Sequence, residues 1–188
     1  MRNIRDCVVC VVGGAGFLGS HLVNYLVGTR GCNVVVVDNL VSGRREFIHP
    51  LADFVHHDIT GSEERMRQIL VDVDYVFNYA AYPYIPVSFE RPLRVFDVNA
   101  NGAIKVINTA QSAGVKAILQ VSSAEIYGDG MPLSMQQMVE TGTDIVEPIM
   151  KLNERCPVAP HSTYGVAKAA VDYYCQTAWR ERNTPVIS

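Results

Sequence analysis

The sequence predicts an α/β protein in which helices cover both faces of a doubly wound parallel sheet. Three observations support this. Apolar, β-branched runs alternate with segments of helical periodicity, most of these runs are apolar at every position, and a glycine-rich turn follows the first run. Continuous apolar runs are typical of parallel strands that are covered on both faces. Because strands that alternate with helices form right-handed βαβ units, the sheet is expected to be doubly wound.

The predicted elements follow one another without an internal repeat or a linker. Strands are expected at Val8–Val12, Asn33–Asp38, Asp53–His57, Val73–Asn78 and Lys116–Ser122, with a sixth beginning at Pro185. Helices are expected at Phe17–Val27, from Ser62 onward, at Leu93–Ala113 and at Ser162–Arg182. We expect residues 1–188 to form one domain, in which residues 129–160 are an irregular, proline-rich insert near the active site.

Composition and charge narrow the class of protein. The chain has 188 residues, 48% hydrophobic and 19% charged, with a formal net charge of -3, so it is globular and lacks a basic surface for nucleic acid. The apolar stretch Cys7–Val12 is too short to span a bilayer, and no secretory signal is recognised before it. The five cysteines are scattered, which favours a reducing, cytoplasmic compartment. Neither nucleic acid nor membrane is an expected partner.

Cys7 and Cys10 form a C-x-x-C pair, the usual spacing of a metal site or a redox disulfide. They lie in a predicted strand, however, where residues three apart point to opposite faces of the sheet. We therefore expect both cysteines to pack in the core, and we expect no metal site.

The run Gly13–Gly19 predicts a dinucleotide site, because it lies between a predicted strand and a predicted helix. Gly13 permits the tight turn, Gly16 lets the backbone approach a pyrophosphate, and Gly19 lets helix and sheet pack closely. The helix that begins at Phe17-Leu18 offers its first N–H groups to the phosphates. The predicted fold is therefore Rossmann-like.

Asp38 lies at the end of the second predicted strand and selects between the two common dinucleotides. An acidic side chain there accepts hydrogen bonds from both ribose hydroxyls and repels a 2′-phosphate, so NAD is favoured over NADP. Arg44 and Arg45 follow closely and would soften this preference if they reached the site. The simpler interpretation is that they belong to a solvated loop.

With these features the sequence resembles the extended short-chain dehydrogenase/reductase family, specifically its NAD-dependent nucleotide-sugar epimerases and dehydratases. The motifs that carry the resemblance are Gly13–Ser20, Val37–Leu40 with Ser42-Gly43, His57–Ile59, Ala80-Ala81, Asn99–Gly102, Val121–Gly128 and Ser162–Lys168. The resemblance implies NAD as cofactor. The residues it assigns to NAD are Gly13, Gly16, Phe17, Leu18, Gly19, Asp38, Asn39, Asp58, Ile59, Ala80, Ala81, Asn99, Ser122, Tyr164 and Lys168.

Tyr164 and Lys168 are four residues apart on a predicted helix, so their side chains leave it from one face. An unperturbed tyrosine, with a pKa of about 10, is a poor base, but a nearby ammonium and the positive nicotinamide ring favour its phenolate. The resemblance implies that Lys168 also holds the nicotinamide ribose and that Ser123 orients the substrate hydroxyl. A sugar hydroxyl would be oxidised transiently, and NAD would be regenerated.

Glu125 distinguishes members of the family that it resembles. It stands two positions after Ser123, which in an extended chain places both side chains on one side. Dehydratases and decarboxylases often have Glu at this position, whereas simple 4-epimerases need no base there. Ala124 stands where 4,6-dehydratases commonly have an acid, so a dehydratase would need another proton donor. Candidates in the insert are Glu140, Asp144 and Glu147.

Several functions stay open at this point. The first is a nucleotide-sugar epimerase or dehydratase with Ser123, Tyr164, Lys168 and Glu125 as catalytic residues. Alternatives are a UDP-sugar 4-epimerase or UDP-glucuronate decarboxylase type in which Glu125 has no role in dehydration, a non-catalytic NAD-binding module, and a dehydrogenase with dissociable cofactor. In an alternative reading, Glu125 is a capping or solvated loop residue.

The resemblance also bears on what this chain can do alone. Family members continue into a C-terminal substrate domain that is absent here, so we expect this chain alone to bind NAD but to turn over UDP-, dTDP- or GDP-sugars poorly or not at all. The family often dimerises through two helices, and the apolar face of Ala167, Ala170, Val171 and Tyr174 would suit a homodimer or pack on the sheet.

Overall fold

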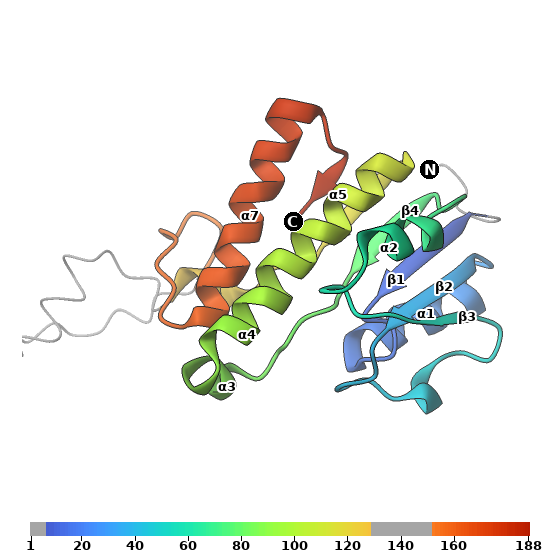
Figure 1. The fold of residues 1–188 in the computed structure, drawn as a ribbon, viewed down its shortest axis with the longest axis horizontal. Coiled ribbons are helices and arrows are strands. Elements are labelled where there is room, and N and C mark those ends of the chain that lie inside the picture. Colours follow the sequence, from blue (N-terminus) through green and yellow to red (C-terminus); the bar gives the residue numbers. More distant parts are fainter. Residues whose placement is uncertain (1–6, 129–151) are drawn as a thin grey trace, which may run out of the picture.

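The computed structural model describes residues 7–128 and 152–188 and shows a six-stranded parallel sheet (Figure 1). The strands lie in the order β3-β2-β1-β4-β5-β6. Their bounds are β1 Val8–Val12, β2 Asn33–Asp38, β3 Asp53–His56, β4 Tyr75–Asn78, β5 Ala117–Gln120 and β6 Val186–Ile187. The predicted fold class is confirmed, and each predicted strand is present, with some ends shorter by one or two residues.

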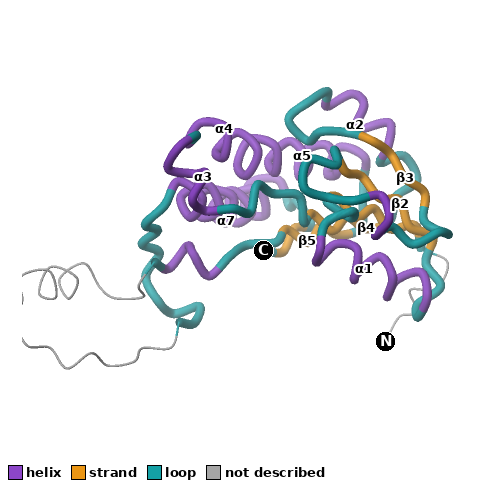
Figure 2. The backbone as a smooth tube through the Cα atoms, turned by 90° about the horizontal axis from the view of Figure 1, so that it is seen from below, coloured by secondary structure: helices purple, strands orange, loops and turns teal. Residues whose placement is uncertain are grey.

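Helices cover both faces of this sheet. The α-helices are α1 Phe17–Gly28, α2 Glu63–Ile69, α3 Ile85–Glu90, α4 Pro92–Phe96, α5 Ala103–Ala113 and α7 Thr163–Arg182. Short 3-10 helices lie at η1 (Arg45–Phe47) and η3 (Ala124–Tyr127), and η2 (Asp97–Gly102) is a π-helix. Figure 2 shows α1 on one side of the strands and α2, α4 and α5 on the other.

Two apolar clusters hold the layers together, one on each face of the sheet. The larger cluster joins α2, α5 and α7 to Cys10, Val12 and Val76, and the smaller one packs α1 against Val9 and Val11. Successive residues of β1 thus point to opposite faces, as expected for a strand buried on both sides. Cys7 packs with the smaller cluster, so its side chain and that of Cys10 point apart, as predicted.

The longest predicted helix differs from the structure. Leu93–Ala113 was expected to be one regular helix, but α4 and α5 are joined by the π-turns of η2. Within η2, Asn99 accepts a hydrogen bond from the Tyr82 N–H at 2.6 Å and donates one to the Tyr82 carbonyl at 3.1 Å. These two bonds tie the helix to the loop after β4. α3, which has Pro86 in its first turn, was not predicted.

The α7 face that contains Ala167 and Val171 packs into the larger cluster with the sheet residues, and Tyr174 lies against the same cluster. Of the two arrangements considered for this face, packing on the sheet is therefore the one present. Among the described helices, none is both long and apolar enough to cross a membrane.

Strand order positions the site. β1 pairs with β2 on one side and with β4 on the other, so the connections after β1 and β4 leave toward opposite halves of the sheet. A crevice therefore opens at the carboxyl ends of β1 and β4, the usual ligand site of such sheets.

Candidate cofactor and active site

A cleft of about 630 Å³ runs across the carboxyl ends of the strands. Its walls come from the glycine turn, from the loops after β2, β3, β4 and β5, and from the start of α7. The lining residues are Gly13, Gly16, Phe17, Leu18, Gly19, Asp38, Asn39, Ser42, His57, Ile59, Tyr79, Ala80, Ala81, Pro83, Val98, Val121, Ser122, Ser123, Tyr164 and Lys168. The volume is within the range of small-molecule and cofactor pockets.

The glycine turn is shaped by backbone contacts. Gly13 has a φ of 79° and donates its N–H to the Val37 carbonyl at 2.7 Å. A Cβ at Gly19 would overlap the Gly13 carbonyl. Gly16 caps α1 with its backbone alone, since within the described structure no side chain caps this helix and its first turn has no acid. The first N–H groups of α1 are therefore available to an anion, which fits a pyrophosphate.

Asp38 is nearly buried at the end of β2 and lines the cleft. One of its oxygens accepts from the Ala15 N–H at 3.0 Å, and the other accepts from the Leu40 N–H at 2.8 Å. Both bonds leave acceptor capacity on each oxygen for ribose hydroxyls. Asp38 therefore fits an adenosine ribose and also fixes the glycine turn relative to β2.

The two arginines that follow Asp38 lie against aromatic rings. The Arg44 guanidinium carbon is 5.9 Å from the centre of the Phe47 ring, and that of Arg45 is 4.3 Å from the Phe54 ring. Among the described residues, neither arginine lines the cleft. This arrangement agrees with the simpler interpretation of these side chains as part of the surface loop.

Asp58 organises its loop instead of lining the described part of the cleft. It accepts hydrogen bonds from the Thr60 N–H at 2.8 Å, the Thr60 hydroxyl at 2.7 Å and the Asn39 amide at 2.9 Å. Burial would raise the pKa of Asp58, but these bonds together hold it below its usual value. Ile59 follows on the cleft wall, and Lys105 fixes the same loop by donating to the Thr60 carbonyl at 2.9 Å.

Polar residues near Ala80 and Ala81 fix the loop after β4 by hydrogen bonds. Asn78, at the end of β4, donates to Gln120 at 2.8 Å and accepts from the Ala80 N–H at 3.2 Å. Asn99, which the resemblance assigns to NAD, is buried against Tyr82 and is not on the described cleft wall. Ala80 and Ala81 themselves line the cleft.

Ser123, Tyr164 and Lys168 all line the cleft. α7 begins one residue before Tyr164, at Thr163, because the hydroxyl of the N-cap residue Ser162 accepts from the Gly165 N–H at 3.0 Å. The Lys168 ammonium lies 5.9 Å from the centre of the Tyr164 ring and donates to the Val121 carbonyl at 2.9 Å. Burial lowers the pKa of Lys168 to about 8, although the charge of Asp172 opposes the shift.

The expectation that Glu125 shares a side with Ser123 is wrong, because the chain is not extended there. The Ser123 hydroxyl accepts from the Glu125 N–H at 3.3 Å and caps the 3-10 helix η3. Glu125 is half-buried and, within the part of the chain described, is not on the cleft wall. Glu140, Asp144 and Glu147 lie outside the described residues, as does most of the predicted insert.

Sequence reasoning missed part of the cleft wall. The residues that it did not assign to the site are Ser42, His57, Tyr79, Pro83, Val98 and Val121. Tyr79 and Val121 immediately follow β4 and β5, so the rule that ligands bind at the carboxyl ends of strands would have found them. Val98 has no such signal, because the π-turns of η2 determine its direction.

Comparisons with known proteins agree with this geometry. Residues 9–188 match the sequence profile of the NAD dependent epimerase/dehydratase family. The chain is 34% identical over 177 residues to a UDP-glucose 4-epimerase of Streptococcus mutans, covering 88% of this chain and 51% of that protein. It is 38% identical over 147 residues to UDP-glucuronic acid decarboxylase 4 of Arabidopsis thaliana, covering 75% and 30%.

Solved structures give the same result. A UDP-N-acetylglucosamine 4-epimerase from Methanobrevibacter ruminantium, in complex with UDP-N-acetylmuramic acid, superimposes with a TM-score of 0.81 at 28% identity, covering 97% of this chain and 53% of that one. The UDP-glucose 4-epimerase of Thermus thermophilus in complex with NAD gives 0.79 at 29% identity, covering 95% and 53%. The chain thus spans about half the length of these proteins.

Proposed function

Because this chain belongs to the NAD-dependent epimerase/dehydratase family, we propose that it holds NAD in the cleft and oxidises a hydroxyl of a UDP-sugar transiently. One observation carries the proposal. Ser123, Tyr164 and Lys168 line the same cleft as the glycine turn. A site that only stored the cofactor would not need this group of side chains.

The cleft offers a partner for each part of NAD. The first N–H groups of α1 after Gly16 would hold the pyrophosphate, Asp38 the adenosine ribose, and Lys168 the nicotinamide ribose. When bound, NAD supplies the acceptor for the hydride of the sugar carbon and returns it later in the cycle.

The protein's own residues move the proton. Tyr164 takes the proton of the sugar hydroxyl on its phenolic oxygen, and Ser123 donates a hydrogen bond that fixes this hydroxyl. The nearby Lys168 ammonium stabilises negative charge on Tyr164. In a 4-epimerase these residues complete the chemistry, because the ketone only needs to be reduced from its other face.

A second candidate is a decarboxylase or dehydratase type, and it rests on Glu125. Glu125 stands two positions after Ser123 in the sequence. The chain is also 38% identical over 147 residues to a UDP-glucuronic acid decarboxylase. In this candidate the Glu125 carboxylate acts at C5, beside the ketone. Because its side chain is outside the described cleft wall, Glu125 must turn toward the sugar when substrate binds.

The test uses the chain with NAD and a panel of UDP-, dTDP- and GDP-sugars in deuterated water. We expect an epimer at C4 for a UDP-sugar, without net accumulation of reduced nicotinamide. Tyr164→Phe should abolish the reaction, while Tyr173→Phe serves as the control because Tyr173 is exposed on the same helix. Slow turnover is expected, so transient absorbance of reduced nicotinamide is followed as well.

Other outcomes would favour another function or remove one of the two candidates. NAD binding without even a transient signal of reduced nicotinamide at saturating sugar nucleotide indicates a non-catalytic module, and net accumulation of reduced nicotinamide indicates a dehydrogenase with dissociable cofactor. Deuterium at C5 favours the second candidate, and it should disappear in Glu125→Gln. If C5 never exchanges, Glu125 has no role there.

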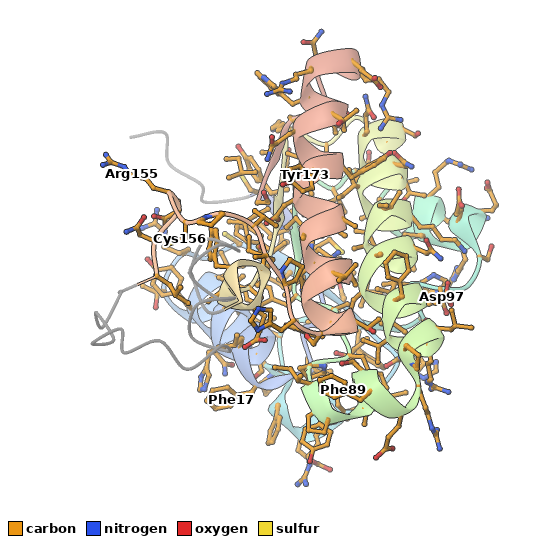
Figure 3. The ribbon with its side chains drawn as sticks, turned by 90° about the vertical axis from the view of Figure 1, so that its left-hand side faces the viewer. Phe17, Phe89, Asp97, Arg155, Cys156 and Tyr173 are labelled. Carbon is orange, nitrogen blue, oxygen red and sulfur yellow. The ribbon has the colours of Figure 1, made fainter. Side chains whose placement is uncertain are left out.

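The homodimer stays a prediction. Ala167 and Val171 are already buried in the core, so pairing through α7 would use exposed residues such as Val166 and Tyr173. Figure 3 shows Tyr173 on the outer side of this helix.

A further inference from the structure

The carboxylate of Asp172 lies next to residues that line the cleft, but Asp172 is not among the described lining residues. Asp172 stands on α7 one turn after Lys168, so the two side chains leave the helix on the same side. One of its oxygens, Oδ2, accepts a hydrogen bond from the Ser122 hydroxyl at 2.7 Å. The other, Oδ1, is buried and has no hydrogen-bond partner among the described residues.

Lys168 and Asp172 contact two consecutive residues at the end of β5. Lys168 donates to the Val121 carbonyl, and Asp172 accepts from Ser122. Ser123, which lines the cleft, comes next in the chain. One face of α7 is therefore hydrogen-bonded to the two residues that precede Ser123, the serine proposed to orient the substrate.

Asp172 is half-buried and its Oδ1 has no hydrogen-bond partner among the described residues, so a nearby cation would offset the cost of burying its charge. Lys168 is the cation whose titration it affects, since its charge raises the pKa of Lys168 against the larger effect of burial. The other titratable groups nearby are Tyr164, whose ring is 5.9 Å from the Lys168 ammonium, and Tyr127 and Cys175. Burial, and to a lesser extent Asp172, raises the pKa of both.

We propose that Asp172 is a positioning residue that holds the end of β5 through Ser122 and keeps the Lys168 ammonium charged where it faces Tyr164. The role assigned to Lys168 rests on the proposed function. Asp172 itself touches neither substrate nor cofactor and acts through these two neighbours. A purely structural aspartate would hold Ser122 equally well as an amide, so the charge is the part to be tested.

The lysine content of the chain allows a direct test by NMR. Only four lysines occur, Lys105, Lys116, Lys151 and Lys168, so ¹³Cε-labelled lysine gives few signals. The signal of Lys168 is assigned by its loss in Lys168→Arg. In the wild-type chain we expect it to titrate with a pKa of about 8. In Asp172→Asn, which keeps the acceptor for Ser122, this pKa should fall by about 1 or more.

Two variants control this measurement. Asp172→Glu restores the charge and should bring the titration of Lys168 back toward its wild-type value. Glu181→Gln removes an acid from the exposed end of the same helix and should leave it unchanged. If Asp172→Asn does not fold, Asp172→Ser replaces it, because a serine is neutral and still accepts from Ser122.

A second measurement tests whether the charge of Lys168 affects NAD binding. The NAD dissociation constant should rise as the pH passes the pKa of Lys168, and this rise should begin at a lower pH in Asp172→Asn. An unchanged titration of Lys168 in the neutral variants overturns the proposal. Because the titration is measured without substrate, that failure is distinct from an absence of sugar turnover, which would refute the proposed function.

Discussion

Lys168 shows how one residue can serve the site while weakening the fold. It is 3% exposed, and its pKa of about 8 lies below the ordinary value of 10.5. Between these values the unfolded chain binds a proton that the folded chain does not, so the contribution of Lys168 to stability rises with pH. The cost of burying the charged Lys168 ammonium is fully present below pH 8, where it lowers the free energy of unfolding by about 3 kcal/mol.

Lys168→Met should therefore stabilise the chain without NAD at pH 7 by about 1 kcal/mol, as measured by urea unfolding, which is less than the full burial cost because Asp172 loses its nearby cation. The Val121 carbonyl keeps a partner in this variant, because the Gln120 amide also donates to it at 3.2 Å. The advantage over wild type should shrink as the pH rises from 8 toward 10.5. A variant less stable than wild type at pH 7 would show that Lys168 contributes more to the fold than its burial takes away.

At the same scale, Glu125 shows where sequence reasoning stops. The alternation rule assumes an extended chain, but the hydroxyl of Ser123 caps a 3-10 turn and rotates Glu125 away. Serine is a frequent cap residue, so the motif held a signal for this turn. By contrast, Asp38 was placed at the cleft because its position depends only on the end of a strand.

At the scale of elements, the start of α1 depends on the absence of a side chain at Gly19. Gly19→Ala should destabilise the chain by about 1–3 kcal/mol and reduce NAD affinity, because its Cβ would overlap the Gly13 carbonyl. Thermal unfolding and calorimetric titration with NAD measure the two effects.

Gly28, at the other end of α1, provides the matched control. An added Cβ there meets no described atom within 4 Å, so Gly28→Ala should stabilise the chain by about 0.5–1 kcal/mol. NAD affinity should not change. Equal effects of the two substitutions would contradict the role given to the glycine turn.

Regular elements could be predicted from the sequence, and irregular ones could not. Apolar runs such as Asn33–Asp38 are explained by burial on both faces, and α7 is explained by its serine cap. The π-turns of η2 break the period of 3.6 residues, and they are held by contacts between Asn99 and Tyr82, which are distant in sequence. No periodicity within one segment reports such a contact.

At the scale of the whole molecule, the cleft joins residues from Gly13 to Lys168. NAD that binds the folded chain only should stabilise it by about 2.7 kcal/mol at a hundredfold excess over its dissociation constant, seen as a higher melting temperature. Amide exchange should slow in the glycine turn and in the loops after β2, β3 and β4.

NADP should give a smaller shift, because its 2′-phosphate meets the Asp38 carboxylate. Asp38→Asn removes this charge and keeps an acceptor for the turn, so it should narrow the difference between the two dinucleotides. Equal shifts with the wild-type chain would show that Asp38 does not select the cofactor.

Apolar side chains remain at the end of the molecule where the cleft opens. Phe17 is 74% exposed and Phe89 67%, and Figure 3 shows both at the same end. The first of these lines the cleft, so a molecule bound in the cleft would meet an apolar side chain there.

The strand order also has a consequence for biosynthesis. β1, β2 and β3 follow one another in the chain and can pair early. Val9 of β1, however, pairs with Tyr75 of β4, so the middle of the sheet forms only after β4 has been made. The crevice between these two strands cannot form before β4 has been made, and Tyr164 and Lys168, which also line the cleft, follow later still with α7. Such distant pairings slow folding. We therefore expect a nascent chain to bind NAD only after most of the domain has left the ribosome, so that bound NAD would report a late stage of folding.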